Sequence, residues 1–542
     1  MNSELFKEND DEAMYKNPYE IRLCDLISVS LNTKPEVTVL KKLAELLKTT
    51  PVLRTEGDTD IEILDVTADS RQVKEGSLFL CLEGAHVDGH KFVDSAVKLG
   101  AKAIVASKEV KAAEGVTVVY VADTRKAMED MVPFFFDYPS RKMRMIALTG
   151  TNGKTTTTHV VSHILEQAGY KTGVIGTIHA LIGDKELPTH NTTPDVIDLE
   201  RLLWQMAEEK VTHVCMEVSS HSLVMGRVEG VEFDNAVFTN LTEDHLDYHK
   251  TMDNYAKAKA ILFEKVSSVG QTKGNKAAWV NVDDPYSHVM MDAVDQKVAD
   301  LHTYSMSDKT ADLYAFDSRF TGKSSAFKVT YEGKTYQFET RLAGRFNIYN
   351  TLGAIGAALS EGISMETIAA AMKTFHSVPG RFELIDEGQS FTVVVDYAHT
   401  PDGLEKILTT AQEITKGRIL VVFGCGGDRD KMKRPIMGRI AARYADVAIV
   451  TSDNPRTEDP ETIVKEVAAG VEEVKAEKPS LQVEVVVDRR SAIQKAISLA
   501  KGDDIVLIAG KGHEDYQILK DKTIHFDDRE EARKALKQSA RF

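Results

Sequence analysis

The segment from Met145 to Thr155 constrains the fold of this chain more than any other. It reads Met-Ile-Ala-Leu-Thr-Gly-Thr-Asn-Gly-Lys-Thr, and an apolar helical face follows it between Val160 and Leu165. This pattern predicts a buried strand, a glycine-rich turn and a helix. Backbone N–H groups at such a helix N-terminus bind phosphate oxygens. The segment therefore predicts a nucleotide site in an α/β domain, against the alternative of a chance Gly-Lys-Thr turn in a loop.

The turn contains the residue types that an ATP phosphate loop requires. Gly150 and Gly153 allow the backbone to close around phosphates. Lys154 is placed to reach the outer phosphates, and the Thr155 hydroxyl is suited to Mg²⁺. The strict phosphate-loop pattern is not met, because Leu148 stands where it requires glycine, and this disfavours a P-loop kinase or GTPase. The predicted ATP-binding residues of the loop are Gly150, Thr151, Asn152, Gly153, Lys154, Thr155 and Thr156.

Composition limits the cellular setting and the class of partner. The formal net charge of -16 argues against general nucleic-acid binding, which depends on Lys and Arg neutralising phosphates. The 4 cysteines are scattered and form no CxxC pair, which is typical of a reducing compartment. The acidic N-terminus is unlike a signal peptide, and no apolar run is long enough to predict a membrane span. We expect a cytoplasmic monomer with no nucleic-acid or membrane partner.

The chain has 542 residues, too many for one core, so several domains are expected. Apolar strand-like segments alternate with helical segments, which is typical of parallel sheets covered on both faces. This predicts the α/β class with three domains. The expected ranges are 1–40 for an N-terminal extension, 41–123 for a first domain, 124–378 for a central domain and 379–542 for a C-terminal domain.

The Gly-Thr-Asn-Gly-Lys-Thr turn resembles the loop of the Mur ligases and the folylpolyglutamate synthetases. Together with seven further segments, it resembles the MurE subfamily of Mur ligases, which adds the third amino acid of the peptidoglycan stem peptide. The resemblance runs from about residue 41 to the C-terminus. The segments are Glu217–His221, Thr239–Asp247, Gly344–Asn350, Pro379–Glu383, Asp396–Pro401, Gly426–Asp430 and Asp453–Arg456.

The resemblance implies a small N-terminal UDP-binding domain, a central P-loop ATPase-like domain and a C-terminal Rossmann-like domain. It also implies an ATP-dependent, amide-forming ligase that uses Mg²⁺. The substrates would be UDP-N-acetylmuramoyl-L-alanyl-D-glutamate and meso-2,6-diaminopimelate. ATP would phosphorylate the D-glutamyl carboxylate, and the amine would then attack the acyl phosphate. Because two anions meet in the first step, the site needs concentrated positive charge.

The same resemblance assigns catalytic and metal-binding roles beside the loop. Glu217 and His245 each follow an apolar stretch, which predicts strand ends, although either could be an ordinary polar group at a loop mouth. Lys259 stands where Mur ligases carry a carbamylated lysine (N6-carboxylysine), and a solvated lysine on a helix is the alternative. The implied catalytic residues are Lys154, Glu217, His245 and Lys259, and the implied metal ligands are Thr155, Glu217, His245 and Lys259 as its carbamate.

Further contacts with ATP and the UDP-sugar are also implied by the resemblance. Asn347 would lie near adenine, Arg381 near phosphate, and Asp396 and His399 near ribose and phosphate. Asn and Asp also favour turns, and Arg381 could be a surface charge. Met225 stands where some members have Gln, so a side-chain contact would be lost there. The residues implied for the UDP-muramoyl dipeptide are Ser70, Ala85, His86, Val87, Thr192, Thr193, Ser219 and Arg227; the two threonines could instead only cap a turn.

Substrate choice is expected to depend on the C-terminal domain, where three strands end in polar segments. Ligands of open α/β sheets bind outside such carboxyl ends. Arg429, Arg456 and Glu514 suit a ligand that carries both a carboxylate and an ammonium, as the far end of diaminopimelate does. Without that carboxylate Arg456 would lack a partner, so it should reject lysine. The implied diaminopimelate-binding residues are Arg429, Asp453, Asn454, Pro455, Arg456, Gly510 and Glu514.

Three other functions are weighed against this one. The first is the same ligase adding L-lysine. A folylpolyglutamate synthetase would share the loop but lack a UDP-binding first domain. A nucleotide-binding regulator that has lost catalysis would be expected to lose Thr155, Glu217, His245 or Lys259, and all four are present.

Overall fold

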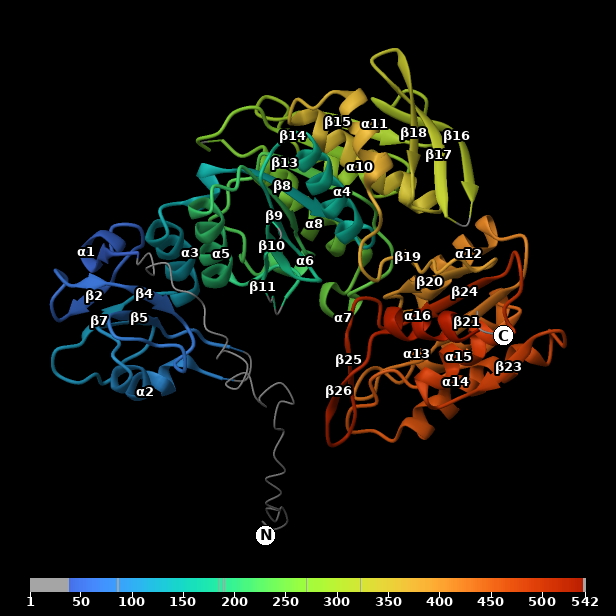
Figure 1. Ribbon diagram of the computed structural model, residues 1–542. Coiled ribbons are helices and arrows are strands. Elements are labelled where there is room, and N and C mark those ends of the chain that lie inside the picture. Colours follow the sequence, from blue (N-terminus) through green and yellow to red (C-terminus); the bar gives the residue numbers. More distant parts are fainter. Residues whose placement is uncertain are drawn as a thin grey trace, which may run out of the picture.

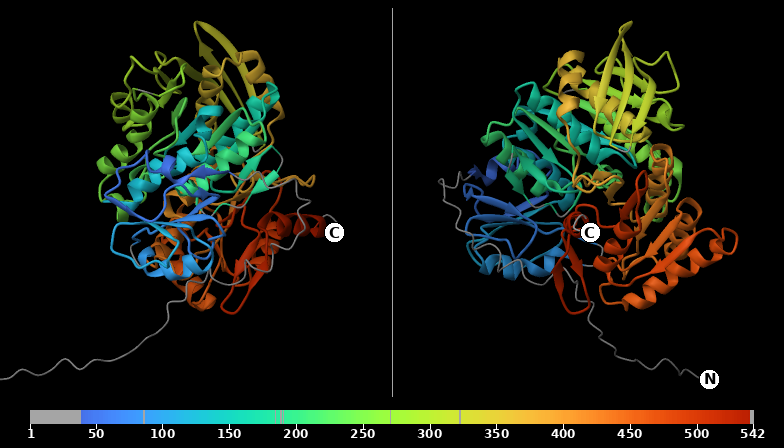
Figure 2. Two further views of the ribbon diagram at one scale, coloured as in Figure 1. Left: turned by 90° about the vertical axis from the view of Figure 1, so that its left-hand side faces the viewer. Right: turned by 45° about the vertical axis from the view of Figure 1, so that its right-hand side comes forward.

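The computed structural model describes residues 39–84, 87–183, 185–187, 189, 191–269, 271–321 and 323–539. These residues form three α/β domains in series, so the predicted fold class is confirmed. The N-terminal domain (blue) and the C-terminal domain (orange to red) both lie below the central domain in Figure 1, and the two views of Figure 2 agree. Almost all of the predicted N-terminal extension lies outside the described residues.

The N-terminal domain is a small sheet flanked by short helices. Its elements are β1 (Lys41–Lys42), α1 (Leu43–Leu46), β2 (Arg54–Glu56), β3 (Glu62–Ile63), β4 (Asp65–Thr67), β5 (Ser77–Leu80), α2 (Val93–Lys98), β6 (Ala103–Ala106), β7 (Thr117–Tyr120) and α3 (Thr124–Phe135). The strand order is β2-β7-β6-β5-β4, and β4 to β7 pair in parallel. Asp123 caps α3, whose buried side chains share the core of this domain. This domain therefore packs around α3 as well as its own sheet.

The central domain contains an 11-stranded sheet, ordered β11-β10-β9-β12-β8-β13-β14-β15-β16-β17-β18. Its strands are β8 (Arg144–Thr149), β9 (Thr172–Ile175), β10 (Ala180–Ile182), β11 (Lys185–Leu187), β12 (His213–Glu217), β13 (Asn235–Phe238), β14 (Ala277–Asn281), β15 (Asp300–Ser305), β16 (Leu313–Thr321), β17 (Ser324–Tyr331) and β18 (Lys334–Thr340). The strands from β9 to β16 in this order pair in parallel, as predicted. The antiparallel pairs at both edges were not predicted.

Helices cover the two faces of this sheet and divide its interior into two large cores. They are α4 (Lys154–Gln167), α5 (Val196–Glu208), α6 (Ser220–Val224), α7 (Leu246–His249), α8 (Met252–Val266), α9 (Ser287–Asp292), α10 (Arg345–Ser360) and α11 (Met365–Thr374). Every residue of β12, β13 and β14 is buried, as expected for parallel strands with helices on both sides. The ATP loop follows β8 in the middle of this sheet.

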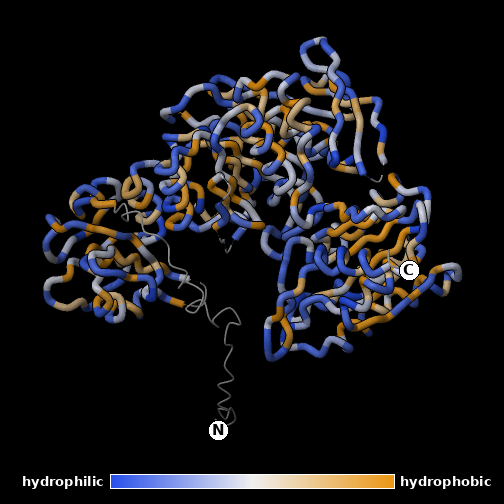
Figure 3. The backbone as a smooth tube through the Cα atoms, in the orientation of Figure 1, coloured by the Kyte–Doolittle hydropathy of each residue, from blue (hydrophilic) through white to orange (hydrophobic). Residues whose placement is uncertain are grey.

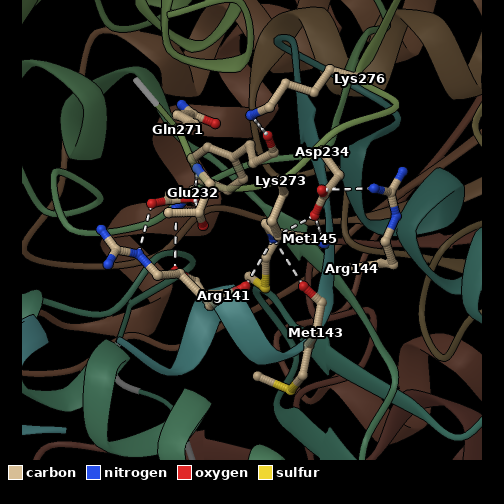
Figure 4. A network of polar contacts seen from close by, with 12 residues as sticks. Arg141, Met143, Arg144, Met145, Glu232, Asp234, Gln271, Lys273 and Lys276 are labelled. Carbon is tan, nitrogen blue, oxygen red and sulfur yellow. Dashed lines mark hydrogen bonds and ion pairs between the residues drawn. The ribbon is translucent and has the colours of Figure 1, made fainter. Parts of the chain in front are cut away.

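A buried polar network closes the opposite end of the central strands (Figure 4). Asp234 precedes β13 and is fully buried. Its carboxylate accepts hydrogen bonds from Met145 N at 2.7 Å, Arg144 Nη1 at 2.8 Å and Lys273 Nζ at 2.5 Å. A buried carboxylate is tolerated when it is paired and hydrogen-bonded in this way. The network joins the beginnings of β8 and β13 to the segment before β14, away from the ATP loop.

The C-terminal domain contains a six-stranded sheet, ordered β19-β20-β24-β21-β22-β23, in which only β19 is antiparallel to its neighbour. Its interior strands are apolar (orange in Figure 3). The elements are β19 (Glu383–Leu384), β20 (Thr392–Asp396), α12 (Pro401–Ile414), β21 (Ile419–Phe423), α13 (Lys433–Tyr444), β22 (Val447–Val450), α14 (Pro460–Lys475), β23 (Gln482–Val485), α15 (Arg489–Leu499), β24 (Ile505–Ala509), β25 (Tyr516–Ile518), β26 (Thr523–His525) and α16 (Asp528–Ser539). Neighbouring β24, β21 and β22 carry the three predicted polar segments at their carboxyl ends. Within the described part of the chain, no helix is long and apolar enough to cross a bilayer.

Candidate active site

The phosphate loop joins β8 to α4 as predicted, and its two glycines have left-handed backbone conformations. Gly150 has a φ of 148°, and Gly153 has a φ of 85°. A Cβ on Gly150 would lie 1.9 Å from Thr239 Oγ1, and a Cβ on Gly153 would lie 2.2 Å from Asn350 Oδ1. Side chains at these positions would therefore be both strained and crowded. The turn brings the chain tightly into α4, whose first N–H groups are suited to phosphate.

Two lysines meet at this loop. Lys154 Nζ donates to the carbonyl oxygens of Gly150 and Thr151, at 2.8 and 2.9 Å. Lys259 on α8 is only 1% exposed, and its Nζ donates to the same Gly150 oxygen at 2.9 Å. Burial and the charge of Lys154 hold the pKa of Lys259 well below its ordinary value. The solvated-lysine alternative for Lys259 is therefore wrong, whereas Lys257 on the same helix is exposed.

Glu217 lies at a strand end beside this loop, as predicted, whereas His245 lies farther along, in the connection between β13 and α7. Glu217 is the last residue of β12, and its carboxylate accepts from Thr177 N at 2.9 Å and from Thr177 Oγ1 at 3.0 Å. His245 is the N-cap residue of α7 and has a φ of 55°. Burial and the charges of Lys154 and Lys259 lower the pKa of His245. Its imidazole is therefore neutral near pH 7 and available as a ligand.

These side chains suit a divalent cation only as a mixed set. Among the described residues, no three His, Cys, Asp or Glu side chains converge on a metal site. The predicted set requires no such triple, because it combines Glu217 and His245 with the Thr155 hydroxyl and a carbamate on Lys259. Glu217 ends β12, Thr155 lies on α4 after β8, and His245 lies in the connection after β13; these three strands are adjacent in the sheet, and Lys259 lies on α8. Oxygen donors predominate in this set, which is the preference of Mg²⁺.

A cavity of about 610 Å³ extends from the phosphate loop to the C-terminal domain. The charged groups Lys154 and Arg381 line it from the two domains. Phe346 and Tyr349 supply aromatic surface on the side of α10. Its dimensions and mixed lining suit a nucleotide. The predicted residues that line it are Thr151, Asn152, Gly153, Lys154, Thr156, His245, Arg381, Asp396 and His399.

Asp396 holds the turn that carries Arg381. Its carboxylate accepts from Phe382 N at 2.7 Å and from Ala398 N at 2.8 Å. The Arg381 guanidinium lies 4.9 Å from the Tyr397 ring centroid, and its Nε is buried without a protein partner. Asp396 thus shapes the turn as well as lining the cavity. Arg381 retains donor capacity for a ligand.

Asn347 does not line this cavity. Its side chain is buried in α10, where Nδ2 donates to Ala343 O at 2.8 Å and Oδ1 accepts from Asn350 Nδ2 at 3.0 Å. Asn350 is the asparagine of this helix that lines the cavity. The adenine role of Asn347 remains a prediction.

A second cavity, of about 1090 Å³, lies between the central and C-terminal domains. Thr192 lines it from the central domain, and Glu514 lines it from the C-terminal domain. Thr192 Oγ1 lies 3.1 Å from Thr177 Oγ1, which itself binds Glu217. Tyr397 lines this cavity as well as the first one. The two cavities therefore share Tyr397 as a wall.

The other residues expected to bind the UDP-sugar and dipeptide have structural partners. Thr193 Oγ1 donates to Glu217 O at 2.9 Å and accepts from Ser219 N at 3.1 Å, so Thr193 does shape this turn. Ser219 caps α6. Arg227 donates to Thr193 O at 3.1 Å and to Met225 Sδ at 3.7 Å, and its Nε is buried without a protein partner.

Met225 thus acts as a thioether acceptor for Arg227 within the chain. In the N-terminal domain Ser70 follows β4, and Val87 is 55% exposed. Ala85 and His86 lie outside the described residues.

The polar segments of the C-terminal domain converge as predicted. Asn454 Nδ2 donates to Glu514 Oε2 at 2.9 Å. Asp453 is buried with no protein partner for Oδ2, and a Cβ on Gly510 would lie 2.6 Å from that oxygen. The charges of Lys511 and Arg489 lower the pKa of Asp453 against the opposing effect of burial. A buried carboxylate oxygen without a partner is suited to a ligand ammonium.

Arg456 and Arg429 flank the backbone at Gly426. A Cβ there would lie 2.7 Å from Arg456 Nη1 and 3.9 Å from Arg429 Cγ. Arg456 Nη1 also donates to Gly427 O at 2.9 Å, whereas Arg429 is exposed. Pro455, between Asn454 and Arg456 in the sequence, is buried. The two arginines thus approach the same stretch of backbone from the loops after β21 and β22.

Two residues of the site were missed by sequence reasoning. Lys511 is fully buried, and its Nζ donates to Asn454 Oδ1 at 3.1 Å and to Glu514 Oε2 at 3.0 Å. Lys511 lies between two glycines in the polar segment after β24, and this position could have identified it as a site residue. Thr177, which holds Glu217, had no signal, because it lies in an ordinary loop after β9.

Comparison with known proteins places these features in a family. The Mur ligase family catalytic domain matches residues 62–135, the Mur ligase middle domain matches 148–358, and the Mur ligase glutamate ligase domain matches 380–512. A solved structure of UDP-N-acetylmuramoyl-L-alanyl-D-glutamate--2,6-diaminopimelate ligase has a TM-score of 0.67 and 32% identity, covering 92% of this chain and 99% of that one. MurF from Acinetobacter baumannii, at 18% identity, shares the fold with a TM-score of 0.62.

Curated relatives cover nearly the whole chain. A protein named UDP-N-acetylmuramoyl-L-alanyl-D-glutamate--2,6-diaminopimelate ligase 1 from Clostridium acetobutylicum is 47% identical, over 89% of this chain and 96% of its own length. The UDP-N-acetylmuramoyl-L-alanyl-D-glutamate--2,6-diaminopimelate ligase from Geobacillus kaustophilus is 48% identical, also over 89% of this chain and 96% of its own length. With the three matched domains and the phosphate loop in place, these similarities show that the chain belongs to the Mur ligase family.

Proposed function

We propose that this chain is the ATP-dependent ligase that joins meso-2,6-diaminopimelate to UDP-N-acetylmuramoyl-L-alanyl-D-glutamate in the cytoplasm, giving the tripeptide, ADP and phosphate. The observation that supports the proposal is that two cavities between the central and C-terminal domains share Tyr397 as a wall. One contains the phosphate loop, and the other contains Thr192 and Glu514. ATP at the phosphate loop and an amino acid near Glu514 would thus lie on two sides of one aromatic side chain.

The first step is phosphorylation of the D-glutamyl carboxylate. A carboxylate oxygen attacks the γ-phosphorus, the bond to ADP breaks, and an acyl phosphate forms. Lys154 and Arg381 line the ATP cavity from opposite domains and place positive charge around the transferred group. Mg²⁺, held by Thr155, Glu217, His245 and carbamylated Lys259, would add charge on the phosphate oxygens when bound.

The second step is amide formation. The amine nitrogen of the amino acid attacks the acyl carbonyl, and the tetrahedral intermediate expels phosphate while the nitrogen loses its proton. Asp453, Asn454, Glu514 and the two guanidiniums of Arg429 and Arg456 would hold the far end of the amino acid. Because Glu514 lines the cavity between the central and C-terminal domains, the reacting amine would then face the central domain. Holding both reactants in one geometry accounts for much of the rate gain in such ligations.

Phosphate release measured with ATP, Mg²⁺ and the UDP-muramoyl dipeptide tests the function. Turnover is expected with meso-diaminopimelate and not with L-lysine, because lysine leaves Arg456 without a carboxylate. Mass spectrometry of the product should show one added diaminopimelate residue. Turnover with lysine alone would keep the mechanism and overturn the substrate. A folded protein that binds ATP but turns over neither would favour the non-catalytic regulator.

A further inference from the structure

A buried ion pair lies behind the two loops that carry Arg429 and Arg456. Arg434 on α13 is 0% exposed. Its Nη2 lies 2.9 Å from Glu458 Oε1, and its Nη1 lies 3.1 Å from Glu458 Oε2. Such a two-point contact fixes the orientation of both groups. Arg434 Nη1 also contacts Glu466 on α14 at 2.6 Å, so the guanidinium is held from two sides.

Glu458 connects this pair to both loops. It follows Arg456 by two positions in the loop after β22, and its Oε1 accepts from Asp428 N at 2.6 Å in the loop after β21. Thr457 Oγ1 donates to Asp428 Oδ1 at 2.7 Å. Gly427 N donates to Asn454 O at 2.9 Å. The two loops are therefore joined side by side, with Glu458 as the charged link to α13.

We propose that Arg434 and Glu458 are positioning residues that set the spacing of Arg429 and Arg456 for the second carboxylate of the diamino acid. The inference rests on the proposed function, since it takes its substrate from it. Two guanidinium groups bind one carboxylate together only when the distance between them fits the size of that carboxylate. Arg429 is exposed, and its Nη1 donates to Asp428 O. Its place is therefore set by the backbone that Glu458 holds.

Helix packing alone does not account for this pair. Arg439 on α13 already contacts Glu473 on α14, at 2.9 Å on the surface. A buried charge is a poor way to join two helices, because removing it from water is costly. Because Arg434 lies behind the two loops, its charge can instead hold Glu458 and, through it, the backbone of both loops. Arg439 provides a matched control, since it joins the same helices without touching either loop.

The test uses the full-length enzyme and steady-state kinetics. Glu458→Gln keeps the shape of the side chain and an acceptor for Asp428 N, but removes the ion pair. Its KM for diaminopimelate should rise about tenfold or more, which corresponds to about 1.4 kcal/mol. Its kcat should change less than about threefold, and its KM for ATP less than about twofold, since the ATP cavity is separate. Arg439→Met should match the wild type in all three constants.

Arg434→Met should raise the KM for diaminopimelate most, because it removes the buried cation. Thr457→Val should raise it least, because Thr457 is exposed and its loss spares the fold. The rise in KM should follow the order Thr457→Val, Glu458→Gln, Arg434→Met. A fall in kcat together with a rise in the ATP KM would indicate a general structural role and overturn the inference. An active wild type with an unaltered Glu458→Gln would overturn the inference alone. A wild type that does not use diaminopimelate would overturn the proposed function and this inference with it.

Discussion

The Nζ atoms of Lys154 and Lys259 both donate to the carbonyl oxygen of Gly150, at 2.8 and 2.9 Å. Removal from water lowers the pKa of both lysines, and the positive charge of Lys154 lowers the pKa of buried Lys259 further. An uncharged Lys259 amine is the form that reacts with CO₂. A carbamate there would replace the repulsion with attraction to Lys154. The geometry thus gives a physical reason for a modified lysine at this position.

Carbamylation of Lys259 makes a direct prediction. Protein equilibrated with ¹³C-bicarbonate should show a carbamate carbon signal by NMR in the wild type, and this signal should be absent in Lys259→Met. The same variant should lose at least about 100-fold in kcat, because it removes negative charge beside the phosphate loop. The carbamate should persist at neutral pH, since the lowered pKa makes the uncharged amine more available than that of an ordinary lysine.

Lys257→Met is the matched control, because Lys257 lies on the same helix and is exposed. It should retain both the carbamate signal and full activity. Loss of the signal in both variants, or its survival in Lys259→Met, would place the modification elsewhere in the chain.

The two glycines at the ends of α4, Gly153 and Gly169, should respond differently to substitution by alanine. Gly153→Ala places a Cβ 2.2 Å from Asn350 Oδ1 at a φ of 85°. Gly169 has a φ of 92°, but a Cβ there meets nothing within 4 Å. Both variants bear backbone strain of about 1 kcal/mol. Only Gly153→Ala should also distort the loop, raising the KM for ATP about tenfold or more.

Thermal unfolding separates the two effects. Gly169→Ala should lower Tm by a few degrees and leave the ATP KM unchanged, whereas Gly153→Ala should alter both. Equal ATP constants in the two variants would show that the crowding at Asn350 is relieved without cost to the loop.

Much of this arrangement could be predicted from the sequence, because the signals are local. The strand, turn and helix around Gly150 and Gly153, and the polar ends of β21, β22 and β24, all follow from short patterns. The antiparallel β16–β18 edge was missed, although Phe327 and Val329 show the alternation of a half-buried strand. Lys511 and Arg434 were missed for another reason. A buried charge looks like a surface charge until the partner that neutralises it is known.

Arg456 should control the choice between acceptors. Arg456→Met removes the guanidinium beside Gly426 and keeps a long side chain at a φ of 54°. The KM for diaminopimelate should rise about 10- to 100-fold, as expected for losing a charged hydrogen-bonded contact. Activity with L-lysine should stay the same or rise, because the cost of an unpaired guanidinium disappears. An equal loss with both amino acids would contradict this role.

Glu200 predicts an unusual dependence of stability on pH. It is 1% exposed on α5, its Oε2 has no hydrogen-bond partner, and burial raises its pKa to about 8 against a weaker opposing effect of Arg141. In the unfolded chain its pKa is near 4.5. Between pH 4.5 and pH 8 the Glu200 carboxyl is ionised in the unfolded chain but stays protonated in the folded protein. Stability must therefore fall as pH rises from 4.5 to 8, by up to about 1.4 kcal/mol per pH unit.

Glu200→Gln removes this dependence, because the amide stays uncharged in both states. Tm measured by calorimetry should show the variant gaining on the wild type steadily between pH 5 and pH 8. Glu208→Gln on the same helix is the matched control, since Glu208 is exposed and its substitution should shift Tm equally at every pH. A constant difference between Glu200→Gln and the wild type across this range would mean that Glu200 ionises in the folded protein. In that case water would enter the space around Glu200, or Arg141 would move closer to its carboxylate.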